Sequence, residues 1–365
     1  MPRARTILAV VGARPNLVKI APILRALEAQ ALAAVLVHTG QHYDAALSDD
    51  LFADLCLPPP AHRLGVGPGS HAAMTGEIMR RLEPVLVAER PDVVLVVGDV
   101  NSTLAAALTA AKLALPVAHV EAGLRSFDRA MPEEVNRVVT DALATLCFTT
   151  EASATAHLLR EGHAAARVHF VGNVMVDSLR WALPRAARSR VRDRLGLAAE
   201  APFAILTLHR PENVDRPDRL AVILAAVAEL ARALPVIFPA HPRVADRLAA
   251  LGWRPTPGIL FGAPLAYLDL VHLLARARLV LTDSGGLQDE TTALGVPCLT
   301  LRERTERPVT VEAGTSVLVG ADPTRILARA RAALSTAPAE RPPPPLWDGH
   351  AAERIAAVLA TAPLD

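Results

Sequence analysis

Carboxylate and cationic side chains concentrate in the stretch PVAHVEAGLRSFDRAMPEEVNR, residues 116–137, directly after a short apolar run. Val117 to Val120 has the length and β-branched content of a buried parallel strand. Ligands of open α/β sheets bind beyond the carboxyl ends of the strands, and Glu121 lies at that end. A carboxylate placed between an apolar strand and a glycine turn has no packing explanation. We therefore predict that Glu121 takes part in acid or base chemistry.

The same stretch carries further charges after the glycine turn. Arg125 adds positive charge, and Pro132 opens a helix whose first turn contains Glu133 and Glu134. Carboxylates on two sides of one loop suit proton transfer. The structural alternative is that Glu133 and Glu134 complement the helix dipole while Arg125 pairs with Asp128.

Two other apolar runs of the first half end in polar side chains. Thr6 to Val11 continues into GARPNLVKIAP, which places Arg14 and Lys19 near the start of a helix. Cations there oppose the helix dipole, so an anionic ligand explains them, although Lys19 on the surface without a role is the alternative. Val93 to Val97 continues into GDVNSTL, which places Asp99 at a strand end as a site carboxylate or as a helix cap.

Cations and a serine-glycine turn follow predicted strands of the second half. TLHRPEN places His209 and Arg210 after one strand, and FPAHPR places His241 after the next. LTDSGGLQDE sets Ser284-Gly285-Gly286 at a strand-to-helix turn, where backbone N–H groups and a hydroxyl can hold phosphate, with Glu290 one turn further on. The alternative is a tight turn with a serine cap. The neighbouring cations favour a diphosphate site.

The elements that must position these residues form a repeated βα pattern. The 365 residues suit two domains with a cleft between them, and 52% hydrophobic with 3% aromatic residues is typical of helices packed on parallel sheets. We predict an α/β fold of two Rossmann-like, doubly wound parallel-sheet domains facing a central cleft, residues 1–172 and 173–348, with a C-terminal helix in 349–365 packing on the first domain. The predicted strands are 6–11, 34–37, 93–97, 117–120, 147–149, 168–171, 203–208, 236–238, 258–261, 279–282, 297–301 and 317–319.

Composition also excludes several classes of function. A net charge of +1 argues against a nucleic-acid partner, and charged residues interrupt every apolar stretch before it reaches the roughly 20 residues that a membrane span needs. Cys56, Cys147 and Cys298 lack metal-site spacing and fit reduced thiols in the cytoplasm. Gly12 does not begin a G-x-G-x-x-G fingerprint, so we expect no nicotinamide cofactor.

With these motifs in place, the sequence closely resembles the non-hydrolysing UDP-N-acetylglucosamine 2-epimerases, which have the two-Rossmann-domain fold of B-type glycosyltransferases. The resemblance covers nearly the whole chain. It runs, in the family's order, through GARPNLVKIAP, GDVNSTL, HVEAGLRSFDRAMPEEVNR, HRPENVD, FPAHPR, TDSGGLQDE and TERPVTVEAGT.

The resemblance implies a role for each candidate residue. Asp99, Glu121 and Glu133 match the acid/base carboxylates, and His209 matches a residue near the leaving diphosphate. The resemblance further implies a UDP-sugar substrate, no cofactor and a homodimer. The residues that match substrate contacts are Arg14, Lys19, Arg125, Arg210, His241, Ser284, Gly285, Gly286 and, for the ribose hydroxyls, Glu290.

The activity that the resemblance implies is reversible epimerisation at carbon 2 of UDP-N-acetylglucosamine to UDP-N-acetylmannosamine through elimination and re-addition of UDP. One alternative is a hydrolysing epimerase that releases UDP and N-acetylmannosamine. A second is a 2-epimerase of a diacetamido uronic acid sugar nucleotide. A B-type glycosyltransferase would share the residues of the second domain but has no use for three carboxylates in the first domain. A non-catalytic nucleotide-sugar sensor is disfavoured because the set of charged site residues is intact.

One departure from the family concerns regulation. Many bacterial members bind a second substrate molecule through two glutamines in a Q-H-R-x pattern and a nearby arginine. This chain keeps Gln41 but has Asp44 at the second position, and a carboxylate should repel a diphosphate. Arg63 lies near enough to replace the arginine. We expect an enzyme without substrate activation.

Overall fold

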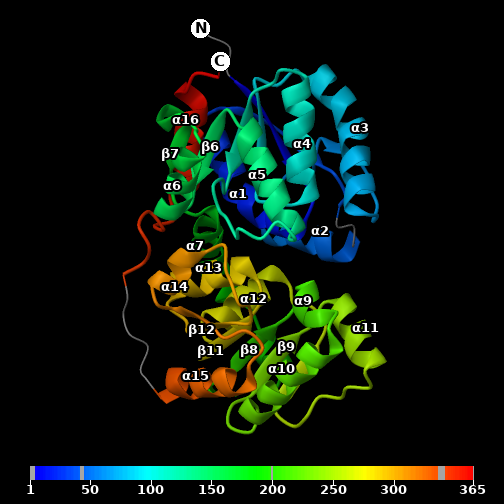
Figure 1. Ribbon diagram of the computed structural model, residues 1–365, viewed down its shortest axis with the longest axis vertical. Helices are drawn as coiled ribbons and strands as arrows, with labels where there is room; N and C mark the ends of the chain where they lie inside the picture. Colours follow the sequence, from blue (N-terminus) through cyan, green and yellow to red (C-terminus); the bar gives the residue numbers. More distant parts are fainter. Residues whose placement is uncertain (1–4, 42–44, 199, 336–341, 365) are drawn as a thin grey trace. The chain divides into compact units, whose positions relative to one another are not determined.

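The structure is a computed structural model that describes residues 5–41, 45–198, 200–335 and 342–364 (Figure 1). The chain divides into two compact units: unit 1 is Met1–Ser178 with Pro345–Asp365, and unit 2 is Leu179–Pro344. The sequence prediction set this boundary near residue 173. In the structure, the chain passes from unit 1 to unit 2 within helix α7, Val174–Ala186.

Unit 1 contains one parallel sheet in the order β3-β2-β1-β4-β5-β6-β7. Six of these strands confirm the predicted ones to within a residue at either end. β3 was missed because a two-residue edge strand leaves no apolar run in the sequence. The strands are β1 (Thr6–Val11), β2 (Ala33–His38), β3 (His62–Arg63), β4 (Val93–Val97), β5 (Val117–Val120), β6 (Leu146–Thr149) and β7 (Val168–Phe170).

Helices connect these strands as a doubly wound fold requires. They are α1 (Arg14–Ala29), α2 (Ala45–Asp54), α3 (His71–Glu89), α4 (Asn101–Lys112), α5 (Pro132–Leu143), α6 (Ala152–Arg160) and the short η1 (Ala165–Arg167). The C-terminal helix α16 (Ala351–Thr361), red in Figure 1, packs against α1. Two hydrogen bonds hold this helix on unit 1. The Trp347 indole donates to the Thr150 carbonyl at 2.9 Å, and Asp177 accepts the Ala352 N–H at 2.8 Å.

Unit 2 repeats the same plan with a parallel sheet in the order β10-β9-β8-β11-β12-β13. Its strands are β8 (Ala204–Thr207), β9 (Val236–Pro239), β10 (Ile259–Gly262), β11 (Leu279–Thr282), β12 (Cys298–Thr300) and β13 (Ser316–Leu318). Its helices are α8 (Val191–Arg194), α9 (Pro211–Val214), α10 (Pro217–Leu230), α11 (Pro242–Ala250), α12 (Tyr267–Leu274), α13 (Gly285–Leu294), α14 (Pro308–Glu312) and α15 (Pro323–Ser335). Two parallel-sheet α/β domains confirm the predicted fold class.

Burial explains why these segments form strands. Every residue of β4, β5 and β11 is buried. β4 is apolar throughout, as a parallel strand covered by helices on both faces requires, whereas β5 and β11 each include one buried polar residue, His119 and Thr282. Helix α4 meets the sheet through alanines, which allow close approach. Within the described part of the chain, no helix combines the length and the apolar composition that crossing a bilayer requires.

Candidate active site

In both sheets several predicted site residues follow the two strands that flank the point where strand order reverses, and Glu121 and His241 follow the next strands, β5 and β9. This point lies between β1 and β4 in unit 1 and between β8 and β11 in unit 2. Connections leave adjacent strands there in opposite directions, which opens a crevice at the carboxyl ends. The loops at these ends carry the candidate residues of each unit.

Lys19 and Glu121 form a buried ion pair at the carboxyl ends of the unit 1 strands. Lys19 Nζ lies 2.5 Å from Glu121 Oε2, and the two side chains are 6% and 2% exposed. Lys19 comes from the second turn of α1, and Glu121 follows β5 directly. The alternative of a surface Lys19 is therefore wrong. Arg14, the first residue of α1, is partly exposed.

The turn at Glu121 has a backbone conformation that side chains other than glycine rarely adopt. Its φ is +74°, and the Glu121 and Ala122 N–H groups both donate to the Phe148 carbonyl at 3.0 Å. Gly123 has φ +80°, and a Cβ there would lie 2.3 Å from the Ala154 carbonyl oxygen. Gly98, with φ +70°, leaves room for the Lys19 ammonium, which a Cβ would approach to 2.9 Å. Gly98 and Gly123 thus both help to position the Lys19–Glu121 ion pair.

Asp99 follows β4 and is held by the buried Arg137 of α5. An Arg137 Nη1 donor bonds the Asp99 carboxylate, and Asn136 Nδ2 donates to the Asp99 carbonyl at 2.8 Å. Asp99 does not cap α4, because Val100 is the N-cap residue. Asn101 and Ser102 lie within the first turn of α4. The Asp99 side chain keeps 22% of its surface exposed, so it remains accessible to a substrate.

Glu133 and Glu134 differ sharply although they are neighbours in the first turn of α5. Glu134 is buried and accepts the Ser126 and Phe127 N–H groups at 2.9 and 3.0 Å and the Arg137 guanidinium at 2.8 Å. Burial alone would raise the pKa of Glu134, but these donors lower it. Glu134 therefore fixes the loop, whereas Glu133 is only partly buried and remains the candidate for chemistry.

Arg125, predicted as a substrate contact, points into unit 1. Its guanidinium donates to Glu161 at 2.8 and 2.6 Å and to the Leu124 carbonyl at 2.8 Å, and it pairs with Asp141 at 2.6 Å. The alternative pairing with Asp128 was wrong, since the Asp128 carboxylate accepts the Ala130 N–H.

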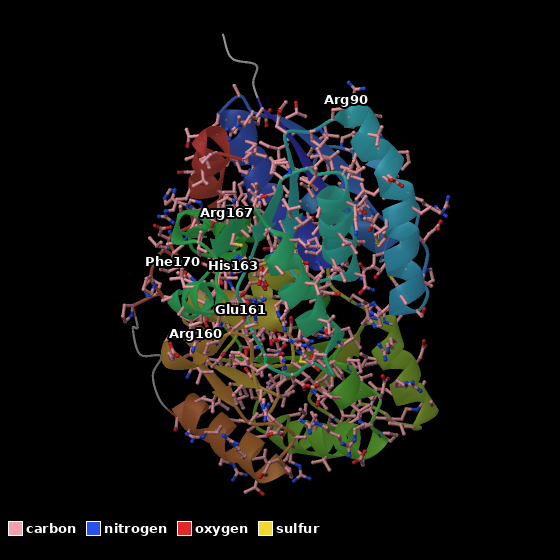
Figure 2. The ribbon with its side chains drawn as sticks, turned by 45° about the horizontal axis from the view of Figure 1, so that its top comes forward. Arg90, Arg160, Glu161, His163, Arg167 and Phe170 are labelled. Carbon is pink, nitrogen blue, oxygen red and sulfur yellow. The ribbon has the colours of Figure 1, made fainter. Side chains whose placement is uncertain are left out.

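A cavity of about 770 Å³ lies beside Arg125 in unit 1. Figure 2 shows Glu161, His163 and Arg167 from its wall along the segment that joins α6 to β7. Neither Asp99 nor Glu121 lines this cavity, so it is separate from the strand-end residues described above.

In unit 2, the buried Asp283 organises the loop after β8. It lies 2.8 Å from His209 Nδ1, accepts the His209 and Arg210 N–H groups at 3.0 and 3.1 Å, and accepts Asn213 Nδ2 at 3.0 Å. Burial would raise the pKa of Asp283, but the His209 charge and these donors lower it. The His209 side chain is 50% exposed, with Nε2 as its second ring nitrogen. Sequence reasoning missed Asp283, although a carboxylate directly after β11 was a usable signal.

The serine-glycine turn forms the N-terminus of α13. Ser284 is the N-cap residue, and its hydroxyl accepts the Leu287 N–H at 3.5 Å, so the predicted serine cap exists. A Cβ on Gly285 would lie 2.8 Å from Arg307 Nε and 2.9 Å from Glu306 Oε1, so a larger residue would require these buried side chains to shift. The N–H groups at the start of a helix of this length favour an anion.

Glu290 lies deeper in α13 and is buried beside another carboxylate. Burial first, then the negative charge of Asp289, raise the pKa of Glu290 to about 8, while a 3.4 Å bond from the Tyr267 hydroxyl opposes the shift. A carboxyl with this pKa suits hydroxyl ligands that favour its ionised form.

The remaining candidate cations of unit 2, Arg210 and His241, follow β8 and β9. Arg210 has a side chain that is 12% exposed and lies 3.6 Å from Glu306. His241 is the exposed N-cap residue of α11, where its Nδ1 accepts the Arg243 N–H at 3.3 Å. Each follows a strand end, as predicted.

Two doubly wound α/β units with charged residues at their strand ends are typical of enzymes that act on anionic, nucleotide-like substrates. Unit 1 carries the carboxylates, and unit 2 carries a helix N-terminus of the kind that favours an anion. The UDP-N-acetylglucosamine 2-epimerase family model matches residues 25–360. The chain therefore belongs to the UDP-N-acetylglucosamine 2-epimerase family, which confirms the resemblance seen in the sequence.

Individual relatives cover almost the entire chain. UDP-2,3-diacetamido-2,3-dideoxy-D-glucuronate 2-epimerase of Pseudomonas aeruginosa is 42% identical over 332 residues, 90% of this chain and 92% of the relative. UDP-N-acetylglucosamine 2-epimerase of Methanocaldococcus jannaschii is 40% identical over 358 residues, 96% and 97% of the two chains. The crystal structure of the latter enzyme with UDP-GlcNAc and UDP matches with a TM-score of 0.91, covering 97% of this chain and 99% of that one.

Proposed function

We propose that the protein interconverts UDP-N-acetylglucosamine and UDP-N-acetylmannosamine without hydrolysing either. The observation that carries this proposal is the placement of Asp99 and Glu121 after the adjacent strands β4 and β5, with Lys19 paired to Glu121, in a chain of the epimerase family. Two carboxylates at one sheet edge supply the proton donor and acceptor that inversion at a carbon centre needs.

The order of bond changes follows from the acidity of the sugar. The hydrogen on carbon 2 has no adjacent carbonyl, so a carboxylate alone cannot remove it at a useful rate. When the bond from carbon 1 to UDP breaks, positive charge on the ring acidifies carbon 2, and Glu121, Asp99 or Glu133 accepts the proton. An acetamidoglucal and UDP result. Return of a proton to the opposite face, with re-addition of UDP, inverts carbon 2.

Unit 2 would hold the UDP moiety. The α13 N-terminus at Ser284–Gly286, with Arg210 and His241, binds the diphosphate and stabilises its growing charge as it leaves. His209, held through Nδ1 by Asp283, presents Nε2 to the leaving group. Glu290 accepts the ribose hydroxyls. Arg14, at the start of α1 in unit 1, is a further candidate for substrate contact. For Arg125 we propose a supporting role in place of direct substrate contact, because Asp141, Glu161 and Leu124 occupy its donors.

A second candidate substrate is a UDP-linked diacetamido uronic acid. The 42% identity to the Pseudomonas aeruginosa diacetamido-glucuronate epimerase favours it, since that value is no lower than the identity to the acetylglucosamine enzymes. The same acid/base residues would serve, because the inverted centre is carbon 2 in both sugars.

Incubation in heavy water followed by proton NMR tests the function. We expect UDP-N-acetylglucosamine to give UDP-N-acetylmannosamine with deuterium at carbon 2. Free N-acetylmannosamine and UDP would identify a hydrolysing enzyme, and the absence of any change with this substrate but turnover of the diacetamido uronic acid would identify the second candidate. No turnover of either would contradict the proposal.

We also propose a cytoplasmic homodimer. The buried face of α5 is polar, whereas its outward residues Val135 and Val139 are 43% and 36% exposed and Phe127 in the preceding loop is 70% exposed. A helix with a buried polar face and an exposed apolar face supports burial of the apolar face against a second copy of the chain. The three cysteines are free, in keeping with a reducing compartment. Light scattering coupled to gel filtration tests the dimer, and Val139→Asp should shift it toward monomer.

A further inference from the structure

We infer that Asp141 and His119 form a buried positioning device that sets the loops of Asp99 and Glu121 relative to each other. The inference rests on the proposed function, because it assigns those loops to proton transfer. Neither residue reaches a substrate, since both side chains are 0% exposed. They act through the backbone of the loops that carry the acid/base groups.

Asp141 of α5 joins one group on β5 and two on the segment that follows this strand. Its Oδ1 lies 2.6 Å from His119 Nδ1, and its Oδ2 accepts the Gly123 N–H at 3.0 Å and pairs with Arg125 at 2.6 Å. Gly123 is two residues beyond Glu121. One carboxylate therefore holds the strand end, the turn and the following cation.

His119 extends this hold to the neighbouring strand. Its Nε2 donates to the Gly98 carbonyl at 2.9 Å, and Gly98 directly precedes Asp99. β4 and β5 are adjacent in the sheet, and the Gly98 N–H in turn donates to the Val120 carbonyl at 3.0 Å. Hydrogen bonds thus link the two loops in a continuous series that runs from Gly98 through His119 and Asp141 to Gly123.

Charge balance explains how such a network survives burial. The Gly98 carbonyl can only accept, so His119 Nε2 carries hydrogen. The Arg125 guanidinium pairs with both Asp141 and Glu161, and its positive charge offsets the buried Asp141 carboxylate.

The strained turn shows what the device must hold. The backbone of Glu121 has φ +74°, a left-handed conformation that is strained for any residue other than glycine. Such a conformation persists only when the surrounding structure enforces it. The Gly123 bond to Asp141 is one of the three N–H bonds that fix residues 121–123, the other two going to Phe148. Releasing it should let the Glu121 carboxylate move away from its working position.

The test compares Asp141→Asn and His119→Gln with Leu86→Ala, a buried residue of α3 outside the network. On folded enzyme, verified by circular dichroism and thermal melting, each network variant should lose about 100-fold in kcat, the usual effect of misplacing a catalytic group by about 1 Å. KM and the calorimetric Kd for UDP should stay within about twofold, because unit 2 is untouched. Leu86→Ala should lower Tm without lowering kcat.

Several outcomes would overturn the inference. A folded Asp141→Asn enzyme with kcat within about threefold of wild type would do so, as would losses in kcat that Leu86→Ala reproduces. Failure of both network variants to fold would make the cluster a stability device only. A wild-type protein without epimerase activity contradicts the proposed function instead, so the two failures are distinguishable.

Discussion

Lys19 and Glu121 meet at 2.5 Å inside unit 1, although they come from the first helix and from the loop after the fifth strand. Both groups lose their hydration, and the cost of removing two charges from water approaches or exceeds their attraction. A pair of two aliphatic residues would serve folding as well. The retention of this pair, on a strained backbone beside Gly98 and Gly123, fits a site that holds a charged carboxylate ready for a reaction.

Breaking the pair from one side should destabilise the protein. Lys19→Met leaves Glu121 buried without its cation, and we expect the free energy of unfolding to fall by about 3 kcal/mol. The double variant Lys19→Met/Glu121→Gln removes both charges and should recover a large part of this loss. Urea unfolding of the two variants measures the effect. Equal stability of the single and double variants would contradict the expected cost of leaving the Glu121 carboxylate buried without its cation.

The three candidate carboxylates should each be essential to turnover. Asp99→Asn, Glu121→Gln and Glu133→Gln should each lower kcat by at least about 100-fold, the usual scale for lost acid/base groups. Glu83→Gln, an exposed change on α3, serves as the control. Near-normal kcat in any of the three removes that residue from the mechanism. If Glu121 handles the carbon 2 proton, its variant should also lose solvent deuterium uptake.

Replacement of the ribose ligand should affect binding more than chemistry. Glu290→Gln should raise KM far more than it lowers kcat, because the ribose contact is nearly equal in the ground and transition states. Initial-rate measurements across substrate concentration separate the two constants. A large fall in kcat with unchanged KM would contradict the assignment of Glu290.

UDP affinity should depend on pH through Glu290. The pKa of this carboxyl is raised to about 8, so the group is mostly protonated at pH 7 and mostly ionised at pH 9. Ribose hydroxyls donate to the ionised form, and binding therefore releases a proton below pH 8. We expect the Kd for UDP to fall by about tenfold between pH 7 and pH 9. Calorimetry in buffers of different ionisation enthalpy detects the proton, and Glu290→Gln should abolish both effects.

Substrate activation should be absent. Asp44, on which this prediction depends, lies outside the described residues, but the Gln41 side-chain oxygen is described and already accepts the Ser102 N–H at 2.9 Å and the Ser102 hydroxyl at 2.7 Å. Rates should be hyperbolic in UDP-N-acetylglucosamine, and the reverse reaction should start from UDP-N-acetylmannosamine alone. A sigmoidal curve, or a reverse reaction that waits for added UDP-N-acetylglucosamine, would reveal coupled sites.

Local sequence determined the strands and the positions of chemistry along them. The run from Val93 to Val97 and the run from Val117 to Val120 are strands with the predicted bounds, because buried parallel strands are mostly apolar on both faces and His119 is the one polar residue of the two runs. The charged residues that follow such runs were therefore known to lie at strand ends. Motif order alone also indicated the family that the comparisons confirm.

Tertiary structure decided which of those charges act on one another. Nothing in the sequence separates Glu133 from Glu134 or directs Arg125 inward, since both outcomes satisfy the same helix start and the same loop. The choice depends on the order of strands in the sheet, which brings α5 against the ends of β4 and β5 and gives Glu134, Arg137 and Asp141 their partners. Ion pairs and hydrogen bonds are short-range in space, whereas a sequence records only neighbours along the chain.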